Sequence, residues 1–300
     1  MLEQEKLEPR SRPGGMEVGG KNLVKLEKML YEKHQLSLFS YRPNYIKRRL
    51  NARIRSLRLD SLSQYLEFLE GHPEEGERFI DSLTISVTNF FRDEDTFRVL
   101  SKKAAPELIN FSRENKTEIR AWSAGCCTGE EAYSLAMMFL ELEPDLVDKT
   151  GLRIWATDID QSAIKFSQDG IYPKVRLDNL HPGLIRRYFQ RHREGYQIRP
   201  LVRKLITFRR ENLLVSGPSG FEGMDLIMCR NLLIYLEREE QIRLLANFDR
   251  SLRQGGYLVL GKTEFMFEPY RSKYQPISVP ERIYQKPFGA MALEQAGGEG

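Results

Sequence analysis

The chain has 300 residues, of which 41% are hydrophobic and 29% charged, with a formal net charge of +4. This length and apolar content allow one large folded domain with a smaller companion, and exclude a wholly disordered chain. The apolar run near the middle of the chain, residues 135–140, is far shorter than the ~20 residues that span a bilayer. The N-terminus lacks the apolar core of a signal peptide, so we expect a cytoplasmic protein.

The cysteines and histidines give no sign of a disulfide framework or a metal site. Cys126 and Cys127 are adjacent, Cys229 stands alone, and the four histidines are scattered, so neither a CxxC pair nor an HExxH motif occurs. We therefore expect reduced cysteines and no bound metal.

The N-terminal part of the chain reads as a leader followed by a helical domain. Residues 1–20 contain two prolines and four glycines with little apolar content, and are predicted to be disordered. Residues 21–87 place apolar side chains at helical spacing, which predicts a domain of about four helices. At the other end, residues 288–300 are rich in Gly and Ala and are also predicted to be disordered.

The second predicted helix carries a run of positive charge. Residues 21–60 hold eleven Lys and Arg against three acids. Arg48, Arg55 and Arg58 share the outer face of this helix, with no acid placed at i+4 to pair with them. A solvated face and a docking site for an anionic partner are both compatible with this pattern.

Residues 86–92, SVTNFFR, join the helical domain to the rest of the chain. The two phenylalanines are compatible with an apolar plug as well as with part of a site. A helix is predicted next over residues 94–112, and Pro106 should bend or restart it.

The stretch IRAWSAGCCTGEEAYSLAMMFL, residues 119–140, organises the remainder of the chain. It predicts a strand, a turn of small residues between Gly125 and Gly129, and a helix that begins at Glu130. Glycines let the backbone approach a ligand, and a helix N-terminus offers unpaired N–H groups. The stretch therefore predicts a nucleotide-type pocket.

A second strand, residues 153–157, ends at Asp158. A carboxylate at this place can accept hydrogen bonds from ribose hydroxyls. Asp160 is predicted to cap the helix that follows, over residues 162–168, so the two acids would have separate tasks.

The remaining pattern predicts an α/β fold. Further elements are predicted as strands at residues 206–209, 225–229 and 257–260, with a helix over residues 239–252. Strands that alternate with helices indicate a mostly parallel, doubly wound sheet. An antiparallel hairpin is predicted within the basic residues 188–205. Ligands bind such sheets at the carboxyl ends of the strands, where loops 211–213 and 230–231 fall.

The residues of the glycine turn indicate which ligand the pocket takes. Gly125 and Gly129 are separated by three residues, unlike the G-x-G-x-x-G of nicotinamide folds. Glu130 and Glu131 follow at once, and two acids at a helix N-terminus would repel a pyrophosphate. They suit a ligand with an ammonium and a sulfonium, which points to S-adenosylmethionine.

Five motifs in order resemble the CheR-type chemotaxis receptor methyltransferases, and the similarity covers roughly residues 21–286. The motifs are TNFFR at 88–92, GCCTGEEAYS at 125–134, ATDID at 156–160, ENLL at 211–214 and CRNLLIYL at 229–236. The resemblance implies a protein-glutamate O-methyltransferase that methylates glutamates on the cytoplasmic helical region of chemoreceptors in chemotaxis adaptation. Methyl esters and S-adenosylhomocysteine would be the products.

The resemblance also implies the fold and the partners. We expect an all-α N-terminal domain before a Rossmann-like S-adenosylmethionine-dependent methyltransferase domain, residues 88–287, with a small antiparallel β-subdomain inserted. The protein is expected to be a monomer that does not bind nucleic acid and does not insert into the membrane. Some members hold a receptor C-terminal pentapeptide on the β-subdomain, and the hairpin alone leaves this open.

Site residues are carried over by the same resemblance. Catalytic roles fall to Arg92, at the active-site wall, and Tyr235, close to the transferred methyl. Arg48, Arg55 and Arg58 would dock the receptor. The implied cofactor residues are Ser86, Thr88, Arg92, Gly125, Glu130, Glu131, Asp158, Asn212, Leu213, Arg230 and Asn231. Within this set, Glu130 or Glu131 would meet the aminoacyl end, Asp158 the ribose, and Asn212 and Leu213 the adenine.

Three positions depart from the family pattern. Ser86 stands where Asn is frequent, Cys127 where Ser or Ala is common, and Ala132 where Pro is common. Serine can still form a hydrogen bond, so cofactor binding is expected, and the role of position 86 stays open.

The implied reaction needs no general base. A glutamate carboxylate is already an anion at neutral pH, and the methyl group is carried by a positive sulfonium. Positioning and removal of water should therefore carry the rate. Arg92 is expected to orient a carboxylate, and Tyr235 to supply a hydrogen bond near the methyl.

Two other functions compete with this interpretation. The basic N-terminal domain would suit a nucleic-acid methyltransferase, but residues 229–232 read CRNL where such enzymes commonly have an NPPY or DPPY loop. A regulatory module that binds S-adenosylmethionine without turnover is the second alternative.

Overall fold

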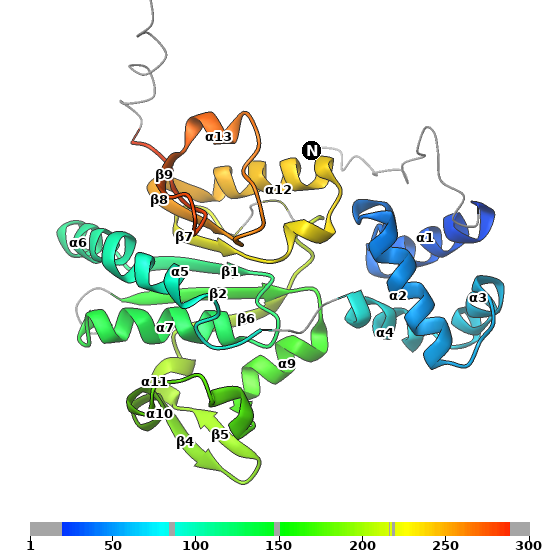
Figure 1. Cartoon of the computed structure of the whole chain (residues 1–300), viewed down its shortest axis with the longest axis horizontal. Coiled ribbons are helices and arrows are strands. Elements are labelled where there is room, and N and C mark those ends of the chain that lie inside the picture. The colour runs from blue at the N-terminus through cyan, green and yellow to red at the C-terminus, as the bar shows by residue number, and fades with distance from the viewer. Residues whose placement is uncertain (1–19, 84–87, 147–150, 216, 218–219, 289–300) are drawn as a thin grey trace, which may run out of the picture. The chain divides into compact units, whose positions relative to one another are not determined.

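The computed structural model describes residues 20–83, 88–146, 151–215, 217 and 220–288 (Figure 1). Ser86 and nearly all of the predicted leader and tail lie outside these residues. The chain divides into two compact units. The first unit comprises Met1–Ile85 together with Tyr235–Glu240, and the second comprises Ser86–Ile234 and Gln241–Gly300.

The first unit is helical, as predicted. Its elements are α1 (Gly20–His34), the short 3-10 helix η1 (Leu38–Ser40), α2 (Pro43–Ser56), α3 (Leu62–Gly71) and α4 (Glu74–Leu83). Pro43 occupies the first position of α2, where its missing N–H costs nothing. The Ser61 hydroxyl caps α3 by accepting the N–H of Gln64 at 3.3 Å. Apolar side chains at the predicted helical spacing, among them Leu26 and Leu50, are buried.

A buried ion pair joins α2 to α4 inside this unit. The Arg53 guanidinium donates from Nε and Nη2 to the two carboxylate oxygens of Glu75, at 2.5 and 2.6 Å. The Tyr65 hydroxyl donates to the same carboxylate at 3.0 Å, and the Glu75 side chain is fully buried. Such a two-pronged contact fixes both the distance and the rotation of the two helices.

A segment from late in the sequence belongs to the helical unit. The ring of Tyr235 lies 4.7 Å from that of Tyr45, measured between centroids, and Leu236 pairs with Tyr41 as an isolated β-bridge. The N–H of Arg42 donates to the Tyr235 carbonyl at 2.9 Å. The backbone contacts of this segment are therefore with residues that precede α2.

The second unit is built on a seven-stranded sheet in the order β6-β2-β1-β7-β8-β10-β9. The strands are β1 (Ile119–Ala124), β2 (Leu152–Asp158), β6 (Ile206–Arg210), β7 (Met224–Cys229), β8 (Leu252–Leu260), β9 (Gln275–Ser278) and β10 (Ile283–Gln285). The first five strands of the order run parallel, with Ala121 of β1 opposite both Ile154 of β2 and Leu226 of β7. The doubly wound parallel sheet is thus confirmed, and the antiparallel strands β9 and β10 extend it beyond the prediction.

Helices cover both faces of this sheet (Figure 1). They are α5 (Glu94–Val99), the π-helical turn η2 (Leu100–Ala104), α6 (Ala105–Asn115), α7 (Glu130–Leu142), α9 (Gln161–Asp169), α12 (Arg238–Ser251) and α13 (Tyr270–Lys273). Pro106 lies at the start of α6, after the π-helical turn, so the predicted restart is confirmed. The Asp160 carboxylate accepts the N–H of Ala163 at 2.9 Å, which confirms the predicted cap of α9.

A small antiparallel sheet in the order β3-β5-β4 is inserted after α9. We call residues 171–205 the insert; Figure 1 shows it on the side of the large sheet that carries α7 and α9. The predicted hairpin is confirmed as its last two strands, and the insert begins earlier, at Ile171. Its elements are β3 (Ile171–Tyr172), the 3-10 helix η3 (Lys174–Leu177), α10 (Pro182–Tyr188), β4 (Phe189–His192), β5 (Gly195–Ile198) and α11 (Pro200–Arg203).

The ion pair between Arg53 on α2 and Glu75 on α4 should stabilise the helical unit. Arg53→Ala leaves the buried Glu75 carboxylate without its cation, and we expect a loss of roughly 3 kcal/mol in the free energy of unfolding. Arg55→Ala, on the exposed side of the same helix, should change it by less than about 0.5 kcal/mol. Urea unfolding followed by circular dichroism measures both. Equal effects of the two substitutions would contradict the structural role assigned to Arg53.

Candidate functional site

The carboxyl ends of the central strands define the candidate site. The strand order reverses between β1 and β7, because the chain continues from β1 to β2 on one side and from β7 to β8 on the other. Loops that leave two such strands in opposite directions open a crevice, where α/β sheets bind their ligands. The loops after β1, β2, β6 and β7 all end at this edge.

The glycine turn after β1 is held in a fixed form. Its first N–H groups, from Gly125 and Cys126, both donate to the Thr157 carbonyl on β2, at 2.8 and 2.9 Å. Gly125 and Gly129 have φ angles of 78° and 90°, in the left-handed region that favours glycine. A Cβ on Gly129 would lie 2.9 Å from Ser167 on α9. The turn thus needs glycine both for its backbone angles and for its close approach to α9.

Asp158 closes this turn from the neighbouring strand. Its carboxylate accepts the N–H of Cys127 at 2.8 Å and that of Asp160 at 3.0 Å, and the side chain is almost fully buried. Burial raises the pKa of this carboxyl above its usual range, while the two backbone donors act in the opposite direction. The backbone carbonyl of Asp158 accepts the N–H of Glu211, which lies in the loop after β6, at 2.9 Å. The loops predicted to meet the ribose and the adenine are therefore adjacent.

The two glutamates that begin α7 point to different partners. The Glu130 side chain is fully buried, and its carboxylate accepts from Thr128 Oγ1 at 2.7 Å and from Arg176 Nη1 at 2.5 Å. Glu131 instead accepts from the Ser123 hydroxyl at 2.8 Å and from Arg230 at 3.4 Å. Of the two predicted aminoacyl contacts, Glu131 is the one that faces the ends of β1 and β7.

Arg230 joins three elements at this edge. Its guanidinium, only 2% exposed, forms ion pairs with Glu131 on α7 and with Asp93 just before α5. Asp93 was not among the predicted site residues. It follows directly after the TNFFR motif, but nothing in the local sequence indicates its pairing with Arg230, 137 positions later. In the structure its φ is 58°, and a non-glycine residue with positive φ often marks a constrained site.

The segment that carries Thr88 and Arg92 is anchored within the same unit. The Phe91 N–H donates to the Ser134 hydroxyl on α7 at 2.8 Å, and the Asn179 side chain donates to the Phe90 carbonyl at 2.6 Å. The fully buried Phe90 ring packs against aromatic rings of the insert, so it acts as an apolar plug. The structure thus shows the apolar-plug role for this segment, and the site roles of Thr88 and Arg92 stay predictions.

A buried glutamate after β8 fixes the loop that holds Arg230 and Asn231. The Glu264 carboxylate accepts the N–H of Leu233 at 2.7 Å and that of Gly261 at 2.6 Å. The side chain is 2% exposed, and burial raises its pKa against the opposing effect of these donors. Sequence reasoning missed Glu264, because nothing local shows that its carboxylate serves a loop thirty residues earlier.

The structure places the remaining predicted residues in the helical unit. Arg48 and Arg55 are exposed on α2, and the Arg48 guanidinium lies 5.7 Å from the centre of the Tyr45 ring. Arg58 is also exposed, but α2 ends at Ser56, so Arg58 lies in the turn that follows rather than on the same helix. Tyr235 packs on Tyr45 within the same unit.

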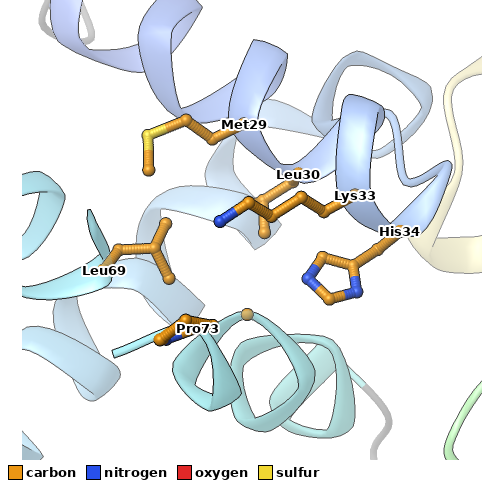
Figure 2. A pocket seen from close by; sticks show the side chains of 7 residues that line it. Met29, Leu30, Lys33, His34, Leu69 and Pro73 are labelled. Atoms are coloured by element: carbon orange, nitrogen blue, oxygen red, sulfur yellow. The ribbon is translucent and has the colours of Figure 1, made fainter. Parts of the chain in front are cut away.

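A hollow in the helical unit is too small for a ligand. Figure 2 shows it between α1, α3 and the start of α4, with Leu30, Lys33, His34 and Leu69 around it. Its space admits about one water molecule. His34 and Glu77 form a hydrogen bond of 3.0 Å at its rim, which gives the histidine a structural partner.

The three cysteines are thiols rather than thiolates at neutral pH. Cys126 and Cys229 are buried, which raises their pKa well above the usual value. Burial, with the nearby charges of Asp158 and Glu130, raises the pKa of Cys127 to about 11.

Among the described residues, no group of three or more His, Cys, Asp or Glu could hold a metal ion. Nor does any described helix have the length and apolarity to cross a bilayer.

The doubly wound sheet, the glycine turn and the acid after β2 define an α/β enzyme that binds a nucleoside cofactor. Comparison with known proteins identifies the family. Residues 86–283 match the CheR methyltransferase SAM binding domain, and residues 21–84 match the CheR methyltransferase all-alpha domain. The chain therefore belongs to the CheR methyltransferase family, and its cofactor is S-adenosylmethionine.

Individual relatives agree with this assignment. The chain is 31% identical to the chemotaxis protein methyltransferase of Borreliella burgdorferi over 81% of this chain and 87% of the relative. It is 32% identical to that of Escherichia coli K12, over 80% of this chain and 82% of the relative. An uncharacterized 104.1 kDa protein of Rhodobacter capsulatus is 34% identical over 88% of this chain, which spans only 28% of that protein.

The pKa of Cys127 predicts an unusual pH profile for its alkylation. Because the thiolate is the reactive form, the rate with iodoacetamide should rise about tenfold per pH unit from pH 8 to pH 10. A thiol with an ordinary pKa would level off near pH 9. Mass spectrometry of the modified peptide at each pH separates Cys127 from the buried Cys126 and Cys229. A plateau by pH 9 would show that neither burial nor the charges of Asp158 and Glu130 govern this thiol.

Proposed function

We propose that the protein transfers the methyl group of S-adenosylmethionine to glutamate side chains in the cytoplasmic region of chemoreceptors. The products are a glutamate methyl ester and S-adenosylhomocysteine, and the reaction serves chemotaxis adaptation in the cytoplasm. One observation favours a carboxylate as acceptor: the loops at the carboxyl edge of the sheet contain no histidine that could remove a proton from the acceptor.

The residues of this edge support that reading one by one. The loops after β1, β2, β6, β7 and β8 contain no histidine. Their cysteines have raised pKa values, and the Glu130 carboxylate is buried beneath its pair with Arg176. An amine or hydroxyl acceptor would have to lose a proton during or before transfer, whereas a carboxylate arrives deprotonated. The names of the chemotaxis relatives support the same class of acceptor protein.

The residues present fit the cofactor. Gly125 and Gly129 give the turn its left-handed backbone angles, Glu131 provides a negative charge for an ammonium, and Asp158 ends β2 where a ribose would lie. Asn212 and Leu213 follow on the adjacent loop, beside the adenine in this proposal. When bound, S-adenosylmethionine supplies a methyl group activated by a positive sulfonium.

The protein's own task is then to orient and to dehydrate the acceptor. Arg92 offers a planar pair of N–H donors that can hold a carboxylate in one orientation. Thr88 lies on the same anchored segment, and Tyr235 is proposed to donate a hydrogen bond near the methyl. Removal of water favours a step in which a carboxylate and a sulfonium neutralise each other.

A labelling experiment tests this function against its alternatives. The protein is incubated with methyl-labelled S-adenosylmethionine and receptor-containing membranes, and the protein fraction is then treated with alkali. Release of the label as methanol identifies a carboxyl ester. Alkali-stable label on nucleic acid would overturn the proposal in favour of a nucleic-acid methyltransferase, and binding without incorporation would favour a regulatory module.

The orienting role of Arg92 has a kinetic consequence. Arg92→Ala should lower kcat/KM for receptor methylation by about tenfold or more, because a charge-assisted contact contributes roughly 1.5–3 kcal/mol. Arg113→Ala, whose side chain pairs with Glu143 on the surface, is the matched control. Methyl-ester formation is measured at several receptor concentrations. A kcat/KM within about threefold of wild type would remove Arg92 from the mechanism.

The exposed arginines of the helical unit are proposed to dock the receptor. Arg48 and Arg55 on α2 and Arg58 after it present positive charge, and they fit a glutamate-rich helix. Arg53 belongs to the same run of sequence but is paired with Glu75, so it is excluded from this surface.

Charge reversal tests the docking surface. The triple change Arg48→Glu, Arg55→Glu and Arg58→Glu should weaken receptor binding at least about tenfold at low salt and leave S-adenosylhomocysteine affinity unchanged. Lys28→Glu, on the exposed side of α1, is the control for a charge reversal outside the proposed surface. Binding to receptor-containing membranes is measured over a range of salt concentrations. If neither the triple change nor the salt concentration alters the receptor affinity, these arginines do not form the docking surface.

A further inference from the structure

The insert is tied to the cofactor turn at one residue, Thr128. The Tyr172 hydroxyl, on β3, donates to the Thr128 carbonyl at 2.6 Å. Arg176, on η3, donates from Nη1 to Thr128 Oγ1 at 3.2 Å. The Thr128 hydroxyl itself donates to Glu130 at 2.7 Å. Thr128 stands directly before Gly129, so these contacts fix the last step of the turn before α7 begins.

The Arg176 guanidinium also balances the negative charge of Glu130 at the start of α7. Arg176 Nη1 lies 2.5 Å from Glu130 Oε1, and the Glu130 side chain is fully buried while that of Arg176 is 30% exposed. The buried carboxylate lies at the N-terminus of α7, where the helix dipole favours it but desolvation opposes it. One cation from the insert therefore stabilises both the charge at the start of α7 and the side chain of Thr128.

Tyr172 and Arg176 hold the turn at Thr128, whereas β2 holds it at its first residues. The inner side of the turn is bonded to Thr157 and Asp158. The turn is thus clamped between the large sheet and the insert. The Ser167 hydroxyl on α9 also donates to the Cys127 carbonyl at 3.2 Å, so the insert adds its contacts at Thr128 to those of β2 and α9.

We propose that Arg176 is a positioning residue for cofactor binding, which acts through Thr128 and Glu130 to keep the glycine turn in its binding form. Tyr172 contributes to the same end through the Thr128 carbonyl. The insert, whose hairpin strand β5 pairs with the strand that carries Tyr172, thereby sets the affinity of the site for S-adenosylmethionine. Arg176 touches neither the methyl nor the acceptor in this proposal.

The test uses the full chain and S-adenosylhomocysteine as the probe, so it does not depend on the identity of the methyl acceptor. Arg176→Ala and Tyr172→Phe are compared with Arg176→Lys, which keeps the charge, and with Arg193→Ala, an exposed arginine of the same insert. Calorimetry gives the Kd, and thermal unfolding reports whether each variant is folded. Hydrogen exchange of η3, with and without the probe, reports whether the insert responds to the cofactor.

The proposal expects a graded loss of affinity. Kd should rise about tenfold in Arg176→Ala and about threefold in Tyr172→Phe, should be partly restored in Arg176→Lys, and should stay at the wild-type value in Arg193→Ala. In the wild type, the probe should slow hydrogen exchange in η3. A purely structural contact would lower the unfolding temperature and leave both Kd and exchange unchanged.

Two outcomes would overturn the proposal. The first is a Kd within about twofold of wild type in the folded forms of both Arg176→Ala and Tyr172→Phe. The second is hydrogen exchange in η3 that does not respond to the probe. If Arg176→Ala does not fold, Tyr172→Phe and Arg176→Lys decide the question by the same criteria, since neither removes the buried charge pair.

Discussion

The candidate site depends on buried carboxylates that hold the loops at the carboxyl edge of the sheet. A loop has no regular backbone partners of its own, and a buried N–H group without an acceptor is costly. Asp158 supplies acceptors to the glycine turn and to the start of α9, and Glu264 supplies them to the loop after β7. Asp158 and Glu264 therefore set the shape of the crevice. The loop residues Cys127 and Leu233 that they bind lie 31 positions away in the sequence.

These carboxylates also determine the charge of the crevice. Asp158 and Glu264 are almost fully buried, and Glu130 is fully so and forms an ion pair with the Arg176 guanidinium of the insert. Glu131 shares Arg230 with Asp93, so two acids share one cation at the ends of β1 and β7. An edge with more negative than positive groups favours a ligand with positive charge, and it disfavours a pyrophosphate. The acids thus hold the loops in place and also select the charge of the ligand.

Sequence reasoning succeeded where the signal is local. The strand, turn and helix of residues 119–140, the cap by Asp160 and the restart at Pro106 depend on neighbours within a few positions. It failed where a partner is distant in sequence. Asp93 meets Arg230 across 137 positions, and Arg176 meets Glu130 across 46, so neither pairing leaves a trace in local spacing. The cofactor class was accessible because it depends on residue types clustered in one motif.

The helical unit shows the same limit in a single run of charge. Spacing placed Arg48 and Arg55 on the outer face of α2 and left Arg53 without a role, and in the structure Arg53 is bound to the buried Glu75 while Arg48 and Arg55 are exposed. The distinction comes from α4, which reaches α2 only in the folded unit. An exposed guanidinium keeps its charge available to a partner. A guanidinium paired with a carboxylate stabilises the fold but exerts little electrostatic attraction on a partner. Any docking by this domain therefore depends on the arginines that α4 leaves unburied, and the geometry of α2 and α4 decides which these are.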